Sequence, residues 1–146
     1  MNCPDIFQQF DLKPIQLDGE LDGQSEQELI GQMVQILSQK HAQQYKGIVY
    51  VWSTQRPIPR LRGESNIIYI GQTKKSIHGR YARFKEELAD WSLPRYEHII
   101  SIYGPIVFFL ASSDNPKDGE AQFLKSYYWD HLEAPPFNGT LPDLSP

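Results

Sequence analysis

The chain is nearly free of cysteine, and its single thiol, at Cys3, can form neither an internal disulfide nor a cysteine-based zinc site. No apolar run approaches the roughly 18 residues that a transmembrane helix needs. The N-terminal residues lack the basic and apolar regions of a secretory signal. These absences predict a reduced, cytoplasmic protein. Its 146 residues, 40% of them hydrophobic, suffice for one domain with a substantial core.

Basic residues are scarce outside one stretch of the chain. The net charge is −4, yet residues 46–85 hold nine Lys or Arg and one acid, whereas the other 106 residues hold five basic and seventeen acidic side chains. This concentration is compatible with a phosphate-binding face on an acidic protein. A basic hairpin that is offset by acidic neighbours and binds no ligand is the alternative.

The chain divides into three parts by composition. Residues 1–23 are rich in acids, with Pro and Gly between them, and predict a loosely ordered acidic arm. Residues 24–139 have the helix and strand patterns that we expect of a single domain, and residues 140–146 are expected to form a C-terminal tail. The domain begins with a helix expected over about Glu26–Gln43, because Ser25 and Glu28 fit a capping box.

Two apolar, β-branched and aromatic runs follow, at Ile48–Trp52 and Ile67–Ile70, and predict an antiparallel hairpin. The connection of residues 53–66 contains two prolines and a glycine, which predicts a long loop in place of a tight turn. It also carries three arginines, Arg56, Arg60 and Arg62, which are candidates for ligand contacts. A solvated loop without a ligand is the alternative.

Helical and strand patterns continue to the end of the domain. An apolar stripe of helical spacing runs from Ile77 to Trp91, with the basic residues Arg83 and Lys85 beside or opposite it. A second helix is expected at Tyr96–Tyr103, a buried strand at Ile106–Ala111 and a final helix at about Lys117–Leu132. The order predicts an α+β domain in which helices flank a small three-stranded antiparallel sheet.

One carboxylate stands out from this pattern. Glu120 shares the inward stripe of the final helix, where a carboxylate is costly unless it is paired. A first-turn glutamate that is favoured by the helix dipole and tilted to solvent is the alternative. The sequence has no P-loop, GxSxG or HExxH motif and no second carboxylate close to Glu120. A single Mg²⁺ can nevertheless be held by one carboxylate, with water and substrate phosphate completing its coordination.

The order of short motifs resembles the GIY-YIG nuclease family. These motifs are GIVY at 47–50, IYIGQT at 68–73, KKSIHGR at 74–80, GEAQFLKSYYW at 119–129 and PPFNG at 135–139. The resemblance spans residues 47–139. It implies a three-stranded antiparallel sheet flanked by helices and a Mg²⁺-dependent (or Mn²⁺-dependent) endonuclease that uses one ion. Such an enzyme cleaves a DNA phosphodiester with water and leaves a 5′-phosphate.

The resemblance also implies a role for individual residues. Tyr50 becomes the general base and Tyr69 a partner of the phosphate or the water. Either Lys74 or Lys75 assists near the tyrosines. Arg80 binds phosphate oxygens through its planar guanidinium. Glu120 becomes the metal ligand, and Asn138 orients other groups unless it only caps the preceding turn. Cations near Tyr50 are expected to lower its pKa from about 10.

Several features depart from the family pattern. Ile48 occupies the usual place of the first glycine, and eighteen residues separate Tyr50 from Tyr69. The spacing from Gly71 to Arg80 is one residue longer than usual. Phe84 stands four residues after Arg80, where many members of the family have His or Tyr. Tyr81 lies nearby but belongs to the apolar stripe. A catalytically weak nucleic-acid-binding module and a protein-interaction domain with an acidic arm are therefore the competing functions. The DNA substrate that the resemblance implies is expected to contact basic residues of the hairpin and the following helix, namely Arg56, Arg60, Arg62, Arg83 and Lys85. Specificity is expected from the arginine-rich loop, a homodimer or a partner protein.

Overall fold

The computed structural model describes residues 1–145, with Asp90 described by its backbone only, and has a mixed α+β architecture. Its centre is a four-stranded antiparallel sheet in the order β1-β4-β2-β3. The strands are β1 (Ile15–Gln16), β2 (Ile48–Pro59), β3 (Glu64–Thr73) and β4 (Ile106–Ser112). The prediction of a three-stranded sheet is therefore wrong, although the α+β class and the antiparallel pairing agree with it.

The fourth strand comes from the segment expected to be a loose arm. Ile15 pairs with Leu110, and the Leu17 and Leu21 amides each donate to a β4 carbonyl at 2.9 Å. Without these partners, apolar β4 would expose an unpaired edge, which proteins rarely leave open. Leu17 and Leu21 are buried as well, so apolar residues interspersed among acids fix this segment to the sheet.

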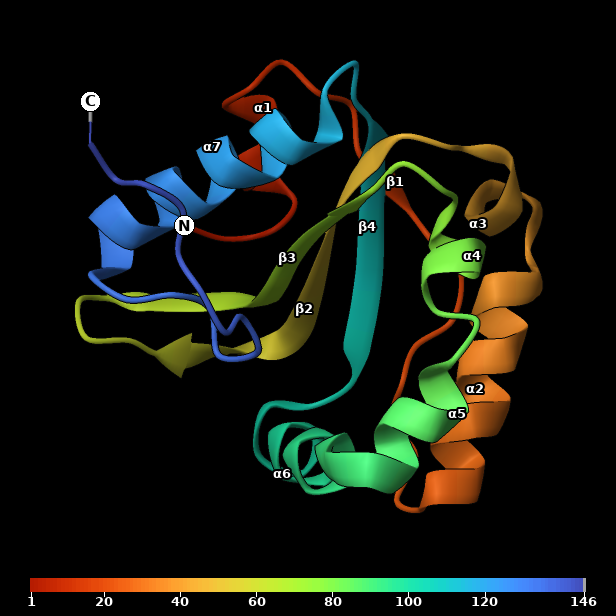
Figure 1. The fold of residues 1–146 in the computed structure, drawn as a ribbon. Coiled ribbons are helices and arrows are strands. Elements are labelled where there is room, and N and C mark those ends of the chain that lie inside the picture. Colours follow the sequence, from red (N-terminus) through yellow and green to blue (C-terminus); the bar gives the residue numbers. More distant parts are fainter. Residues whose placement is uncertain (146) are drawn as a thin grey trace.

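Helices cover both faces of the sheet (Figure 1). One face carries α1 (Asp5–Gln8) and α7 (Pro116–His131), which pack over a small core that includes Val49, Val51 and Phe123. The opposite face carries the remaining helices over a larger core. They are α2 (Glu26–Ser38), α3 (Lys40–Gln44), α4 (Ile77–Arg80), α5 (Phe84–Glu87), the π-helical turn η1 (Leu88–Ser92) and α6 (Leu93–Tyr103). No helix within residues 1–145 combines the length and apolar character needed to cross a membrane.

Two expected helices are broken into shorter pieces. The first ends at Ser38, because the backbone of Gln39 is extended, and resumes as α3. The stripe from Ile77 to Trp91 divides into α4, α5 and η1. Trp91, expected to face the core, is 62% exposed. Pro94 occupies the first turn of α6, where a missing N–H costs nothing.

The hairpin is longer than the sequence predicted, and its connection is short. β2 extends to Pro59 and β3 starts at Glu64, so the Arg60 amide closes a tight turn on the Gly63 carbonyl at 2.9 Å. Gly63 adopts φ +71°, which favours glycine. Pro57 is accommodated because the strand register is irregular between Ser53 and Ile58. Most of the predicted loop is therefore strand.

Candidate active site

The register of the hairpin explains the glycine that ends the IYIG motif. Tyr50 on β2 lies directly opposite Gly71 on β3. A Cβ atom at residue 71 would lie 2.5 Å from Cζ of the Tyr50 ring, well inside van der Waals contact. The ring is fully buried and cannot move aside. Tyr50 therefore requires glycine at this position.

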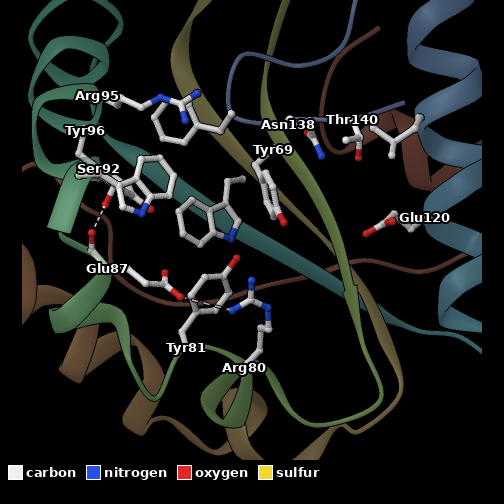
Figure 2. Close-up of a pocket in the computed structure, with 15 residues that line it drawn as sticks. Tyr69, Arg80, Tyr81, Glu87, Ser92, Arg95, Tyr96, Glu120, Asn138 and Thr140 are labelled. Carbon is white, nitrogen blue, oxygen red and sulfur yellow. Dashed lines mark hydrogen bonds and ion pairs between the residues drawn. The ribbon is translucent and has the colours of Figure 1, made fainter. Parts of the chain in front are cut away.

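A cavity of about 490 Å³ opens beside this hairpin (Figure 2). It lies at the outer strand of the sheet, β3, and takes residues from β2, β3, α4–α7 and the C-terminal segment. Its lining residues are Trp52, Tyr69, Arg80, Tyr81, Glu87, Trp91, Ser92, Arg95, Tyr96, Glu120, Leu124, Phe137, Asn138, Gly139 and Thr140. Four of the seven catalytic residues predicted from the sequence are among them: Tyr69, Arg80, Glu120 and Asn138. In Figure 2 the Tyr69 ring lies between the Arg80–Tyr81 pair and Glu120.

Three tyrosines meet at this end of the hairpin, but they differ in access to the cavity. Tyr69 is half-buried and lines it. Tyr81 also lines it, and its hydroxyl donates to the Tyr50 hydroxyl at 3.1 Å. Tyr50 is fully buried and does not line the cavity. Its ring centroid lies 6.0 Å from that of Tyr69 and 5.7 Å from that of Tyr81.

Burial controls the protonation of two of these tyrosines. Removal from solvent raises the pKa of Tyr50, and the neighbouring Tyr69 adds to that effect more than Arg80 opposes it. Burial likewise holds the pKa of Tyr81 well above its usual range. In the protein alone, Tyr50 therefore does not have the lowered pKa that the sequence led us to expect. Both hydroxyls are neutral at physiological pH.

Arg80 is presented by the short helix α4. Ser76 caps this helix, with its hydroxyl accepting from the Gly79 amide at 3.1 Å, and Arg80 occupies the last position. Its guanidinium lies 5.0 Å from the centre of the Tyr81 ring. Nη1 also approaches Oε1 of Glu87 at 3.6 Å, and both side chains are 40% exposed. A surface pair of this kind is weak, so a phosphate can compete for the guanidinium.

Glu120 lies in the second turn of α7, which Asn115 caps through the Asp118 amide at 3.2 Å. Its carboxylate is half-buried in the cavity wall, and burial raises its pKa above the ordinary value of 4.5. Within residues 1–145 no hydrogen bond or ion pair to this carboxylate is found. Glu120 therefore faces the cavity, as the inward alternative predicted, and its carboxylate is available to an external partner.

Asn138 fastens the C-terminal segment to the edge of the sheet. Its Oδ1 accepts from the Ile70 amide at 3.0 Å, and its Nδ2 donates to the Ile70 carbonyl at 2.8 Å. The Phe137 amide donates to the Ile68 carbonyl at 2.8 Å. These bonds cover part of the open edge of β3 and bring residues 137–140 into the cavity wall. Asn138 therefore acts on the structure of the site, and its amide oxygen is already engaged.

The expected assisting lysines do not enter the cavity. Lys74 and Lys75 are exposed on the turn after β3, and their backbone carbonyls accept from the Gly47 amide at 3.1 and 3.3 Å. Arg83 and Lys85 are also exposed and lie outside the cavity lining. They remain accessible to a ligand on the surrounding surface.

The three arginines of the hairpin bind the protein itself. Arg56 donates to the Ile102 carbonyl at 3.1 Å. Arg60 donates to the Ala134 carbonyl at 2.7 Å and pairs with Glu133. Arg62 donates to the carbonyls of Trp129 and Asp130 near the C-terminal end of α7. These contacts join the hairpin to α6 and α7, so the arginines have a structural role that the sequence did not reveal.

Sequence reasoning missed several residues of the cavity. Tyr81 was assigned to the core alone, and Trp52, Glu87, Arg95 and Tyr96 were not considered. Two local signals were present: Tyr81 follows Arg80 directly, and Trp52 shares its strand face with Tyr50 through the two-residue repeat. Arg95 and Tyr96 come from a separate helix, and no local pattern connects them to the hairpin.

Comparison with protein-family models, with curated proteins and with solved structures finds no match for this chain.

Proposed function

We propose that this protein is a metal-dependent DNA endonuclease that works in the manner of the GIY-YIG nucleases its motifs resemble. The observation that supports the proposal is the convergence of Tyr69, Arg80 and Glu120 on one cavity, with Asn138 bracing its edge. These residues come from β3, α4, α7 and the C-terminal segment. They supply a proton acceptor, a cation for phosphate and a carboxylate, the groups that phosphodiester hydrolysis requires.

Tyr69 takes the role of general base in this proposal. Its ring borders the cavity, whereas the Tyr50 hydroxyl is buried behind it and bound to Tyr81. A base must come within hydrogen-bond reach of the water it activates. Tyr50 and Tyr81 then act as positioning residues, because their packed rings hold Tyr69 in place.

Arg80 binds the phosphodiester through its guanidinium. In the free protein this group pairs with the partly exposed Glu87. The two non-bridging oxygens of a phosphodiester can accept a pair of parallel hydrogen bonds from the guanidinium fork, and the exposed Glu87 pair is weak, so the phosphate displaces Glu87 on binding. The same contact stabilises the negative charge that builds on the phosphate during attack.

The donor set fits one hard cation such as Mg²⁺ or Mn²⁺. Glu120 offers a half-buried carboxylate with no partner found among residues 1–145, and a bound cation would offset the burial that raises its pKa. The described residues contain no cluster of three His, Cys, Asp or Glu side chains suited to a metal. Water and substrate phosphate would therefore complete the coordination. When bound, the ion would supply charge stabilisation for the leaving oxygen.

A nucleic-acid-binding module with little catalytic power is the second candidate. The observation that favours it is the raised pKa of Tyr50 and Tyr81, which leaves both hydroxyls neutral in the protein alone. Such a module keeps the cavity and binds DNA in a salt-dependent manner without metal-dependent cutting. A homodimer or a partner protein could supply specificity to either form. We place either form in the cytoplasm.

Plasmid cleavage in Mg²⁺ and in EDTA tests the choice between the two candidates. We expect Mg²⁺-dependent nicking by the wild-type protein and its loss in Tyr69→Phe and Glu120→Gln. The matched control is Glu97→Gln, which neutralises an exposed glutamate of α6 outside the cavity and should leave cutting unchanged. Nicking that persists in Glu120→Gln would refute the assignment of this carboxylate. Salt-dependent DNA binding without nicking by the wild-type protein would favour the binding module.

A further inference from the structure

The π-helical turn η1 places one aromatic residue of the apolar stripe in solvent. Ile77, Tyr81, Phe84 and Leu88 are all at most 4% exposed. The next step of this stripe would bury Trp91, yet Trp91 is 62% exposed. Ser92 is buried instead, and its hydroxyl donates to the Glu87 carbonyl at 3.0 Å. Helical turns of the π type are rare and are frequent at functional sites.

Trp91 lies at the cavity wall beside a fixed cation. The Arg95 guanidinium lies 5.6 Å from the centre of the Trp91 ring and 4.6 Å from that of Phe137. Arg95 also donates to the Pro136 carbonyl at 2.6 Å, so it is anchored by the C-terminal segment. This arrangement steadies the indole while leaving most of it open to solvent. A single exposed tryptophan is unremarkable, but one that is braced at the rim of a cavity can bind a planar ligand.

The cavity combines an aromatic wall with a phosphate-binding cation. Trp91 and Arg80 line the same cavity of about 490 Å³. Bases stack on aromatic side chains when they are unpaired, while cations follow the phosphate backbone. In a duplex, each base face is already covered by its neighbours. The presence of both Trp91 and Arg80 in the cavity lining therefore favours a nucleotide whose base is unpaired over one in a duplex.

The cavity lining also contains a donor that lacks a partner. Nε1 of Trp52 is buried, and no acceptor for it is found within residues 1–145. An unsatisfied buried N–H carries a desolvation cost and calls for an explanation. The Trp52 ring packs against those of Tyr69, Tyr81 and Tyr96, so this wall of the cavity contains a polar group that the described residues leave unsatisfied.

We infer that the cavity receives one unpaired nucleotide, with its base stacked on Trp91 and its phosphate on Arg80. This inference rests on the proposed nucleic-acid function and narrows the substrate class. The protein should act on single-stranded, bulged or flapped DNA in preference to a continuous duplex. Trp91 is thereby a specificity-determining residue, because it contacts the base and not the reacting phosphate.

Fluorescence anisotropy in EDTA tests the inference without cleavage. The probes are a labelled single strand, the matching duplex, and that duplex with an unpaired flap. The variants are Trp91→Ala and Trp91→Phe, with Trp129→Ala as the control, because Trp129 is 56% exposed on α7 and lies outside the cavity lining. Thermal unfolding establishes that each variant is folded.

We expect Trp91→Ala to weaken binding of the single strand and of the flap by about 5- to 150-fold, the range for loss of one base–aromatic stack. Trp91→Phe should retain most of the affinity, and Trp129→Ala all of it. Duplex affinity should not change in any variant. Equal weakening of duplex and single strand, or no effect of Trp91→Ala, would overturn the inference and leave the nuclease proposal standing. A wild-type protein that binds none of the three probes would also overturn the inference, whereas the nuclease proposal is decided separately by plasmid cleavage in Mg²⁺.

Discussion

Replacing Gly71 by alanine should destabilise the protein through a single steric conflict. The added Cβ would lie 2.5 Å from Cζ of Tyr50 and 2.6 Å from its Cε2 and hydroxyl oxygen. Ordinary carbon–carbon contacts are about 3.5–4.0 Å, so an overlap of about 1 Å must be relieved. Tyr50 is fully buried, and its hydroxyl is bound by Tyr81. The ring can therefore move only by displacing its neighbours.

Overpacking of a buried site costs about 1–3 kcal/mol, and each kcal/mol should lower the melting temperature by about 2–4 °C in a chain of this size. Urea unfolding followed by circular dichroism measures the loss directly. The matched control is Gly31→Ala, because Gly31 lies inside α2 and a Cβ there meets nothing within 4 Å. This control should stabilise the protein by about 0.5–1 kcal/mol.

A double-mutant cycle with Tyr50→Ala isolates the conflict. Once the ring is gone, Gly71→Ala should lose most of its penalty, which gives a coupling energy of about 1–3 kcal/mol. The reasoning is refuted if Gly71→Ala matches wild type in stability. It also fails if the penalty persists in the Tyr50→Ala background, since another contact would then be responsible.

Three further predictions concern protonation, the sheet edge and the hairpin arginines. Burial raises the pKa of Glu120, so the folded state holds this proton more tightly than the unfolded chain. In metal-free buffer, the stabilisation from this proton should therefore be lost as the pH rises from below 4.5 through the higher folded pKa. Glu120→Gln should remove this loss, which is measured as the urea midpoint at each pH. Wild-type and Glu120→Gln curves that stay parallel across this pH range would contradict the prediction. Asn138→Ala should lower the free energy of unfolding by about 1–3 kcal/mol and speed hydrogen exchange of the Ile70 amide, measured by NMR, because that amide loses its acceptor. Unchanged exchange protection of the Ile70 amide would contradict this role of Asn138. Arg62→Ala should lower stability yet leave unchanged the slope of the logarithm of the DNA-binding constant against the logarithm of the salt concentration. Replacing the exposed Lys85 by alanine should reduce that slope by about 1. The reverse pattern would identify Arg62 as a DNA contact.

Local patterns in the sequence predicted the parts of the fold that depend on near neighbours. The final helix was placed within one residue at each end, at Pro116–His131, because its apolar spacing is regular. The core of the hairpin was found through its β-branched runs. Glu120 was singled out because it lies one turn before Phe123 and Leu124, with an inward and a solvent-tilted carboxylate left as alternatives, and it lines the cavity.

Pairings between distant residues were not predictable in the same way. Strand β1 has only two residues, and its identity depends on the open edge of β4 some ninety positions later. The hairpin arginines bind carbonyls that belong to other elements, such as those of Trp129 and Asp130 for Arg62. An arginine in the sequence gives no sign of whether its side chain will bind solvent or a carbonyl of the protein. The predicted loop is wrong in secondary structure, since most of it is strand, and the contacts of its arginines within the protein were not foreseen.

The tyrosine cluster shows how substrate and protein must act together in the proposed reaction. A neutral Tyr50 and a neutral Tyr81 are compatible with packing, since their shared hydrogen bond satisfies hydroxyls that would otherwise be buried without partners. A phenolate at either position would be a buried charge. For Tyr50, burial outweighs the Tyr81 hydroxyl and Arg80, which both favour the phenolate, and the pKa stays raised. Tyr69 borders the cavity, where a bound cation and the phosphate-engaged Arg80 would share the same space. Under the proposed mechanism the proton acceptor is Tyr69, the half-buried tyrosine of the cavity wall, because burial keeps Tyr50 and Tyr81 neutral. Tyr50→Phe should therefore weaken plasmid nicking far less than Tyr69→Phe.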